Sequence, residues 1–172
     1  MQNPRLFSFT AGGTGLWRIR EIRPILGEGL PVATHLDHRP GEPDATGIWR
    51  LRGVTSNERY VTHEEQQQLV SVQEGLGRPA SVYATLIPIR KSAAWWTLTQ
   101  EQRREIFEAQ SHHTRTGLKY LPAIARRLHH CRDLATAEPF DFLTWFEYHP
   151  DDEPAFDRLL AELRETPEWR YV

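Results

Sequence analysis

Short β-strands are predicted for the first third of the chain by its pattern of apolar and polar positions. The ranges 6–10 and 17–26 favour strands, and the glycines between them are typical of a hairpin or turn. Apolar and basic residues alternate over 48–54, as in a half-buried strand. The range 27–47 is rich in proline and glycine and lacks periodicity, so we expect a long surface connection there.

A helix is then predicted over 63–74, because Thr62 and Glu65 form the spacing of a capping box and glycines follow. The first half therefore reads as strands followed by one helix.

The second half of the chain has stronger signals. Segment 120–131 fits a helix or a strand, and a strand is preferred because Pro122 prevents a preceding helix from continuing. The predicted elements are a strand over 82–89, a helix from Thr99 to near Gly117, strands over 120–131 and 140–148, a helix over 154–165 and a last strand over 168–172. This order is that of a ferredoxin-like α+β fold, with helices covering one face of an antiparallel sheet.

Composition narrows the class of protein. The chain has 172 residues, a net charge of −2 and one cysteine, and it has no apolar run long enough for a membrane span. We therefore expect an intracellular, cytoplasmic protein with no nucleic-acid or membrane partner. Six tryptophans and eight histidines can line a flat cofactor, although core tryptophans would give the same composition.

His112 and His113 are adjacent on the predicted long helix, so at most one of them faces the sheet. The helical spacing of Ile106, Phe107 and Gln110 selects His113 as that residue. A single inward histidine is more often an ordinary hydrogen-bonded residue than a ligand, so this position alone decides nothing.

Glu147 and Arg126 are candidate functional residues on two predicted strands. Glu147 shares a strand face with Trp145, and a buried carboxylate there needs a partner such as a histidine N–H, whereas an exposed face would leave it in water. Arg126 alternates with apolar residues, so it either orients a small anion or pairs with a carboxylate such as Glu147.

The histidines and Cys131 also raise the alternative of a zinc site. Histidine and cysteine are common zinc ligands. The residues at 112–113 and at 129–131, however, have neither the spacing of two ligands on one helix face nor that of a Cys-x-x-Cys motif. Zinc is therefore the weaker interpretation.

Three stretches together resemble the chlorite dismutase family. They are IPIRKSAAWW at 87–96, SHHT at 111–114 leading to YLPAIAR at 120–126, and FDFLTWFE at 140–147. The resemblance covers residues 49–172, and the short chain is similar to the compact, dimeric branch of that family. It implies two ferredoxin-like halves of the dimeric α/β barrel type, with a reduced N-terminal half over 1–80 and a haem-binding C-terminal half over 81–172.

The resemblance also implies a haem b cofactor. It assigns His113 as the proximal iron ligand, Glu147 as the hydrogen-bond partner of that ligand and Arg126 as the distal catalytic residue. The positions expected beside the cofactor are Lys91 and Tyr60 at the haem propionates, and Trp95 and Trp96 next to the porphyrin.

The implied reaction converts chlorite to chloride and dioxygen, in a homodimer that binds chlorite or another small anion. The same superfamily includes peroxidases and coprohaem decarboxylases, and a non-enzymatic haem sensor or carrier is a further alternative. The decarboxylase branch has glutamine at the position of Arg126 and tyrosine at that of Ile87, so both residues favour chlorite chemistry.

Overall fold

The computed structural model describes residues 5–55, 63–72 and 75–172. The chain forms two compact units, one made of residues 1–56 with 129–143 and the other of 57–128 with 144–172. The expected boundary between two ferredoxin-like halves, after residue 80, is a different kind of division and stays a prediction. Within the described residues, no helix is long and apolar enough to cross a bilayer.

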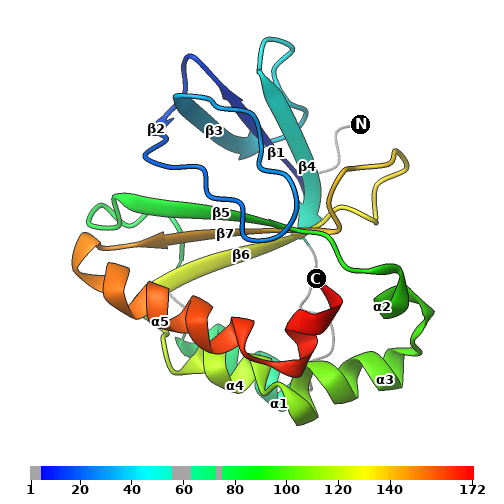
Figure 1. The fold of residues 1–172 in the computed structure, drawn as a ribbon. Helices are drawn as coiled ribbons and strands as arrows, with labels where there is room; N and C mark the ends of the chain where they lie inside the picture. Colours follow the sequence, from blue (N-terminus) through cyan, green and yellow to red (C-terminus); the bar gives the residue numbers. More distant parts are fainter. Residues whose placement is uncertain (1–4, 56–62, 73–74) are drawn as a thin grey trace. The chain divides into compact units, whose positions relative to one another are not determined.

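The first unit is built from antiparallel strands in the order β2-β3-β1-β4 (Figure 1). Their bounds are Leu6–Gly12 for β1, Trp17–Arg18 for β2, His35–Pro40 for β3 and Trp49–Thr55 for β4. In the same unit, β4 pairs with the last residues of β6, where Val54 lies opposite His130. The predicted strand over 17–26 is thus much shorter than expected.

β3 corrects the expectation of a long connection over 27–47. Its sequence is polar apart from Leu36, which is buried, so it shows no apolar alternation. Its place is set by main-chain pairing with β1, from Phe7 opposite Pro40 to Gly12 opposite His35. Such pairing depends on the partner strand, so the pattern of apolar and polar residues in β3 itself does not predict it.

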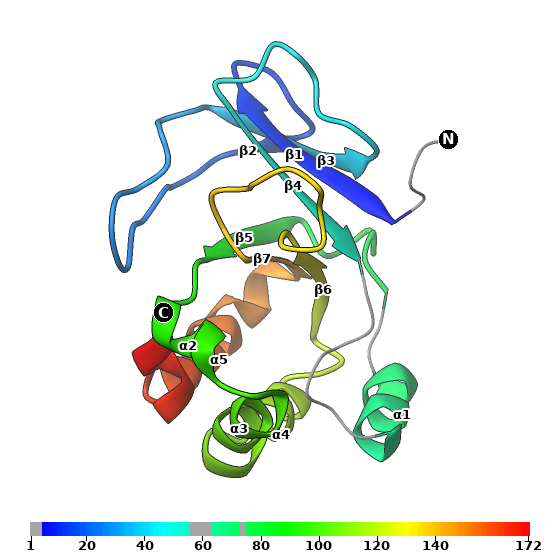
Figure 2. The same cartoon turned by 90° about the vertical axis from the view of Figure 1, so that its right-hand side faces the viewer.

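The second unit has β6, β7 and β5 in that order, with helices α3, α4 and α5 on one side of them (Figures 1 and 2). The bounds are His63–Val72 for α1, Tyr83–Ile89 for β5, Ala93–Thr97 for α2, Gln100–Arg104 for α3, His113–Leu118 for α4, Ile124–His130 for β6, Phe142–Tyr148 for β7 and Glu153–Arg164 for α5. These strands and α5 lie where the sequence predicts them; Thr62, the expected cap of α1, lies outside the described residues.

One face of β6 and β7 packs on α5. Ile124 of β6 and Phe146 and Tyr148 of β7 form a buried cluster with Phe156 and Leu159 of α5. Because side chains alternate along a strand, this cluster fixes which residues of β6 and β7 face the helices. Arg126, two residues after Ile124, belongs to the helix-covered face.

The predicted helix from Thr99 to Gly117 is broken into three segments. Thr99 forms the expected capping box with Gln102 at the start of α3, but a π-helical turn, η1, follows over Glu105–Gln110. His112 then adopts a left-handed conformation with φ of 50°, and α4 begins at His113. A wide turn of this kind is frequent at functional sites.

The chain ends in a 3₁₀ helix rather than the predicted strand. This helix, η3, covers Pro167–Tyr171 and follows α5 after Thr166. Pro167 has a fixed φ that suits the first turn of a helix. A shorter 3₁₀ helix, η2, covers Pro150–Asp152 before α5.

Candidate active site

His113 is the first residue of α4 and its ring is held by two neighbours. Its Nδ1 atom lies 2.8 Å from Oε2 of Glu168, and the ring of Phe107 stacks on it with centroids 4.2 Å apart. Since Nδ1 faces the carboxylate, Nε2 is the ring nitrogen left to bind a metal. His112, in contrast, is exposed.

The backbone around His113 is also fixed. His112 is the N-cap residue of α4, yet its side chain makes no capping hydrogen bond. Glu108 of η1 supplies the acceptor instead, because its Oε2 accepts a hydrogen bond of 2.9 Å from the amide of Thr114. A carboxylate at the start of a helix satisfies an amide that has no partner within the helix.

Glu168 joins His113 to Lys91. Its Oε1 accepts a hydrogen bond of 2.7 Å from Nζ of Lys91, whose side chain is only 5% exposed. Burial raises the pKa of the Glu168 carboxyl, but His113 and Lys91 together outweigh burial and hold that pKa at about 2. Glu168 is therefore a carboxylate at neutral pH, and a carboxylate is one of the usual partners of a metal-binding imidazole.

Glu147 is not the partner of His113, which corrects the expected assignment. Its Oε1 accepts a hydrogen bond of 2.8 Å from the indole of Trp145, and its Oε2 accepts one of 2.6 Å from the amide of Gly77. Trp145 and Glu147 alternate with Phe146 and Tyr148, which face α5. Glu147 therefore lies on the strand face opposite the helices.

Lys91, which is expected at a haem propionate, contacts two residues of its own chain. Its ammonium group is bound to Glu168 and lies 4.7 Å from the ring centroid of Trp95. A lysine held in this way stabilises the carboxylate beside His113.

Trp95 and Trp96 belong to α2. Trp95 is buried, and its ring lies 5.5 Å from that of Tyr171. Arg103 of α3 donates hydrogen bonds of 3.1 Å to the carbonyl of Trp95 and 2.8 Å to that of Trp96. The backbone of both tryptophans is thus anchored by α3, and the ring of Trp95 lies beside Lys91. Tyr60, the other expected propionate residue, lies outside the described residues.

Arg126 lies on the helix-covered face of β6 and is partly buried. Ile87 of β5, the position of tyrosine in the decarboxylase branch, packs against the same apolar cluster. The second unit thus presents a cation and an apolar surface on the side of the sheet where α4 carries His113.

The donor set suits a haem better than a bare metal ion. His113 offers one nitrogen backed by a carboxylate, which is a common arrangement for an axial haem ligand. In the part of the chain that the structure describes, no three histidine, cysteine, aspartate or glutamate residues are grouped so as to hold a metal ion. A cofactor that brings its own four nitrogen ligands needs only one from the protein.

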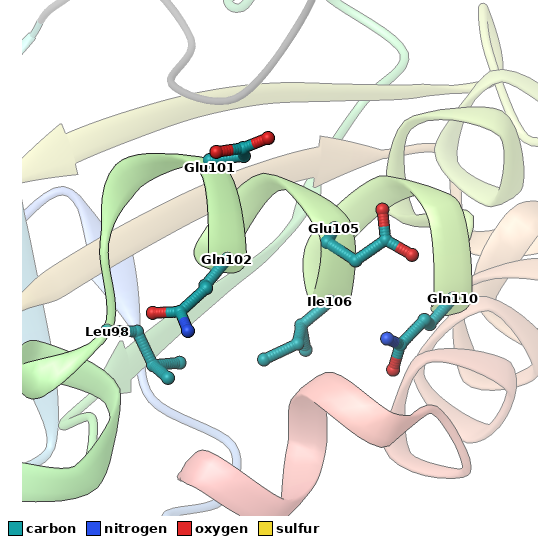
Figure 3. Close-up of a pocket in the computed structure, with 6 residues that line it drawn as sticks. All are labelled: Leu98, Glu101, Gln102, Glu105, Ile106 and Gln110. Carbon is teal, nitrogen blue, oxygen red and sulfur yellow. The ribbon is translucent and has the colours of Figure 1, made fainter.

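A separate pocket of about 380 Å³ lies along α3 and η1, lined by Leu98, Glu101, Gln102, Glu105, Ile106 and Gln110. Figure 3 shows Leu98 and Ile106 on one side of the helix and Glu101 on the other. The pocket contains none of the residues expected at the haem, and its two carboxylates would repel an anionic cofactor. This pocket is therefore distinct from the candidate site at His113.

Glu168 is a candidate functional residue that sequence reasoning missed. The signal was weak, because Glu168 lies in a short terminal segment that was expected to be a strand. Its aromatic neighbours Trp169 and Tyr171 are partly buried, so the segment packs on the protein instead of extending into solvent. The aromatic residues Trp169 and Tyr171 beside this carboxylate are the sequence feature that could have indicated a packed segment.

Comparison with known proteins gives consistent matches. The family model for chlorite dismutase matches residues 39–172. A chlorite dismutase from Ideonella dechloratans is 33% identical over 123 residues, which cover 70% of this chain and 40% of that protein. The chain therefore spans less than half the length of this curated relative.

Solved structures show the same relationship. A dimeric chlorite dismutase from Nitrobacter winogradskyi is 54% identical, with a TM-score of 0.90 over 96% of this chain and 94% of that one. The chlorite dismutase of Candidatus Nitrospira defluvii in complex with imidazole is 31% identical, with a TM-score of 0.57 over 72% of this chain and 48% of that one. This chain belongs to the chlorite dismutase family.

Proposed function

We propose that this protein is a haem b enzyme that converts chlorite to chloride and dioxygen. The observation that carries the proposal is the imidazole of His113, whose Nδ1 is engaged by Glu168 so that Nε2 is left as a ligand. Membership of the family and the 54% identity to a dimeric chlorite dismutase support the same reaction. When bound, the haem iron supplies the redox chemistry of the reaction.

The proximal residues would hold and tune the cofactor. His113 binds through Nε2, while the carboxylate of Glu168 makes the imidazole a stronger donor. Lys91 keeps Glu168 charged and in place, and the stacked ring of Phe107 limits rotation of the imidazole. These contacts preset the ligand before the cofactor arrives.

Arg126 would act on the substrate side. Its guanidinium is charged at any physiological pH, so it attracts chlorite and orients it without a proton transfer. The same charge would retain hypochlorite, the anion that chlorite becomes on losing one oxygen atom, until chloride and dioxygen are formed. Its position on the helix-covered face of β6 supports this role.

We also propose a cytoplasmic homodimer. The dimeric relative supports the assembly, and the lone thiol of Cys131 agrees with a reducing compartment. Light scattering of the haem-loaded protein should give twice the mass of the chain, and cell fractionation should recover it with cytoplasmic markers. A monomer would contradict the proposed dimer, and recovery outside the cytoplasm would contradict the proposed location.

The reaction is tested with a dioxygen electrode on haem-loaded protein after chlorite is added. Arg126→Gln keeps part of the side-chain length and its hydrogen-bonding ability but removes the charge, so dioxygen yield per haem should fall several-fold and a hypochlorite trap should protect the variant from bleaching. Arg127→Gln is the matched control, because Arg127 is the adjacent arginine on the opposite strand face. Haem-loaded parent protein that evolves no dioxygen would overturn the proposed function. Equal losses in both variants would remove the role of Arg126.

A further inference from the structure

We infer that Ser111 is a positioning residue that sets the hydrogen bond between Glu168 and His113, an inference that rests on the proposed haem function. Ser111 is 4% exposed. Its hydroxyl oxygen accepts a hydrogen bond of 3.0 Å from the backbone amide of Glu168. The contact holds the backbone of Glu168 while its side chain reaches His113 and Lys91.

The amide of Glu168 needs an outside acceptor. Glu168 is the second residue of η3, and the first amides of a helix have no acceptor within the helix. The side chain of Thr166, the N-cap residue of η3, makes no capping hydrogen bond; its hydroxyl donates instead to the carbonyl of Leu163. Ser111 thus takes the place of a cap, from a distant part of the sequence.

The other end of η3 is also held. The carbonyl of Tyr171 accepts a hydrogen bond of 2.7 Å from the amide of Ser92, and the ring of Tyr171 packs on Trp95. The segment is therefore held at both ends, and of these two backbone contacts it is that of Ser111 that acts on Glu168 itself.

Ser111 also lies two residues before His113. Its amide donates to the carbonyl of Ile106 in the wide turn of η1, and His112 follows in the left-handed conformation. One residue is thereby joined through the chain to the imidazole and through its hydroxyl to the backbone of the carboxylate. Ser111 therefore sets the separation between the two partners.

Loss of the Ser111 hydroxyl should make the distance between the Glu168 carboxylate and the His113 imidazole more variable, while both groups remain present. A charge-assisted hydrogen bond weakens as its length and angle depart from ideal values. A weaker bond at Nδ1 makes the imidazole a poorer donor to iron, which favours the reduced state of the haem. Ser111→Ala should therefore raise the haem reduction potential and lower the frequency of the iron–histidine vibration in the ferrous protein.

The test compares Ser111→Ala with Thr166→Ala. The control also removes a hydroxyl beside η3, but one that bonds the carbonyl of Leu163 and not Glu168. Both variants are made in the parent and in Glu168→Gln, and the potential and the iron–histidine vibration are measured by redox titration and resonance Raman spectroscopy. We expect a shift for Ser111→Ala in the parent, little shift for Thr166→Ala, and a largely lost effect of Ser111→Ala in Glu168→Gln.

A measurement on the haem-free protein separates this inference from the proposed function. Amide hydrogen exchange at Glu168 should be faster in Ser111→Ala than in Thr166→Ala, because the acceptor is lost. Unchanged exchange, an unchanged potential, or a shift of equal size in Glu168→Gln would overturn the role of Ser111. Absence of dioxygen evolution from a protein that shows the expected shifts would refute the reaction and leave the role of Ser111 standing.

Discussion

Trp145 and Glu147, two residues apart on β7, are joined by a hydrogen bond of 2.8 Å from the indole nitrogen to the carboxylate. The bond holds Glu147 on the face of β7 that points away from α5, while Glu168 reaches His113 from η3. The carboxylates of Glu147 and Glu168 thus have different tasks, since one bonds Trp145 on its own strand and the other supports the proposed iron ligand.

The first prediction separates these two carboxylates. Glu168→Gln should alter the absorption and lower the retention of bound haem, whereas Glu147→Gln should keep the parent spectrum. Glu168→Gln also leaves the buried ammonium group of Lys91 without its anion, which should cost about 3–5 kcal/mol of unfolding free energy. Haem titrations and urea unfolding check both effects. A changed spectrum in Glu147→Gln with a normal one in Glu168→Gln would reverse the assignment.

The second prediction concerns the adjacent histidines. His112 has a φ of 50°, a conformation that costs an ordinary residue roughly 1–2 kcal/mol and glycine little. His112→Gly should therefore bind haem normally and unfold at a free energy equal to that of the parent or up to about 1 kcal/mol higher. His113→Ala should lose most of the Soret band. Comparable haem loss in the two variants would contradict the assignment of the ligand.

The sequence predicted the strands β5, β6 and β7 and the helix α5 because their alternation, prolines and capping residues are local signals. The break between α3 and α4 has no such signal, since the residues of η1 also suit an ordinary helix. The assignment of Glu147 on β7 as the partner of His113 was wrong for another reason. Alternation shows that Trp145 and Glu147 share a face, but both faces of β7 are buried, so it does not show which one the helices cover.

The sequence pointed to only part of the candidate site. His113 was proposed from helical spacing and the family resemblance, although η1 and the left-handed His112 interrupt the helix on which that spacing relied. Glu168 was not predicted, because its contacts with Lys91 and His113 join segments that are far apart in the chain. The contact of Ser111 could not be predicted for the same reason, since its hydroxyl accepts a hydrogen bond from a backbone amide of η3.

The third prediction uses Cys131, which is buried in the first unit. Burial, followed by the charges of Glu138, Asp141 and Asp133, raises the pKa of its thiol to about 12. The thiol should therefore resist alkylation by iodoacetamide at pH 8 in the folded protein and react rapidly in urea. As the pH rises above about 9, the unfolded thiol ionises first, so Cys131 should lower stability there. Cys131→Ser should flatten this part of the pH dependence, and rapid alkylation without urea would contradict the burial.

The fourth prediction concerns an ion pair of the first unit. Nη2 of Arg52 lies 2.6 Å from Oε1 of Glu138, whose side chain is 9% exposed. A double-mutant cycle with Arg52→Met and Glu138→Gln should give a coupling of about 1–3 kcal/mol in unfolding free energy. The matched pair of Arg39 and Asp44 is exposed on both sides and should give about 0–1 kcal/mol. Equal couplings would show that burial adds nothing to the first pair.

The burial of both faces of β7 limits which insertions and deletions this strand can tolerate. Trp145 and Glu147 on one face alternate with Phe146 and Tyr148 on the other, and each of these side chains is buried. A single-residue insertion or deletion within this strand would exchange the two sets, placing a carboxylate against the apolar residues of α5 and a phenylalanine against the amide of Gly77. We expect length variation among relatives to fall in the loops that flank β7, with the strand itself conserved in length.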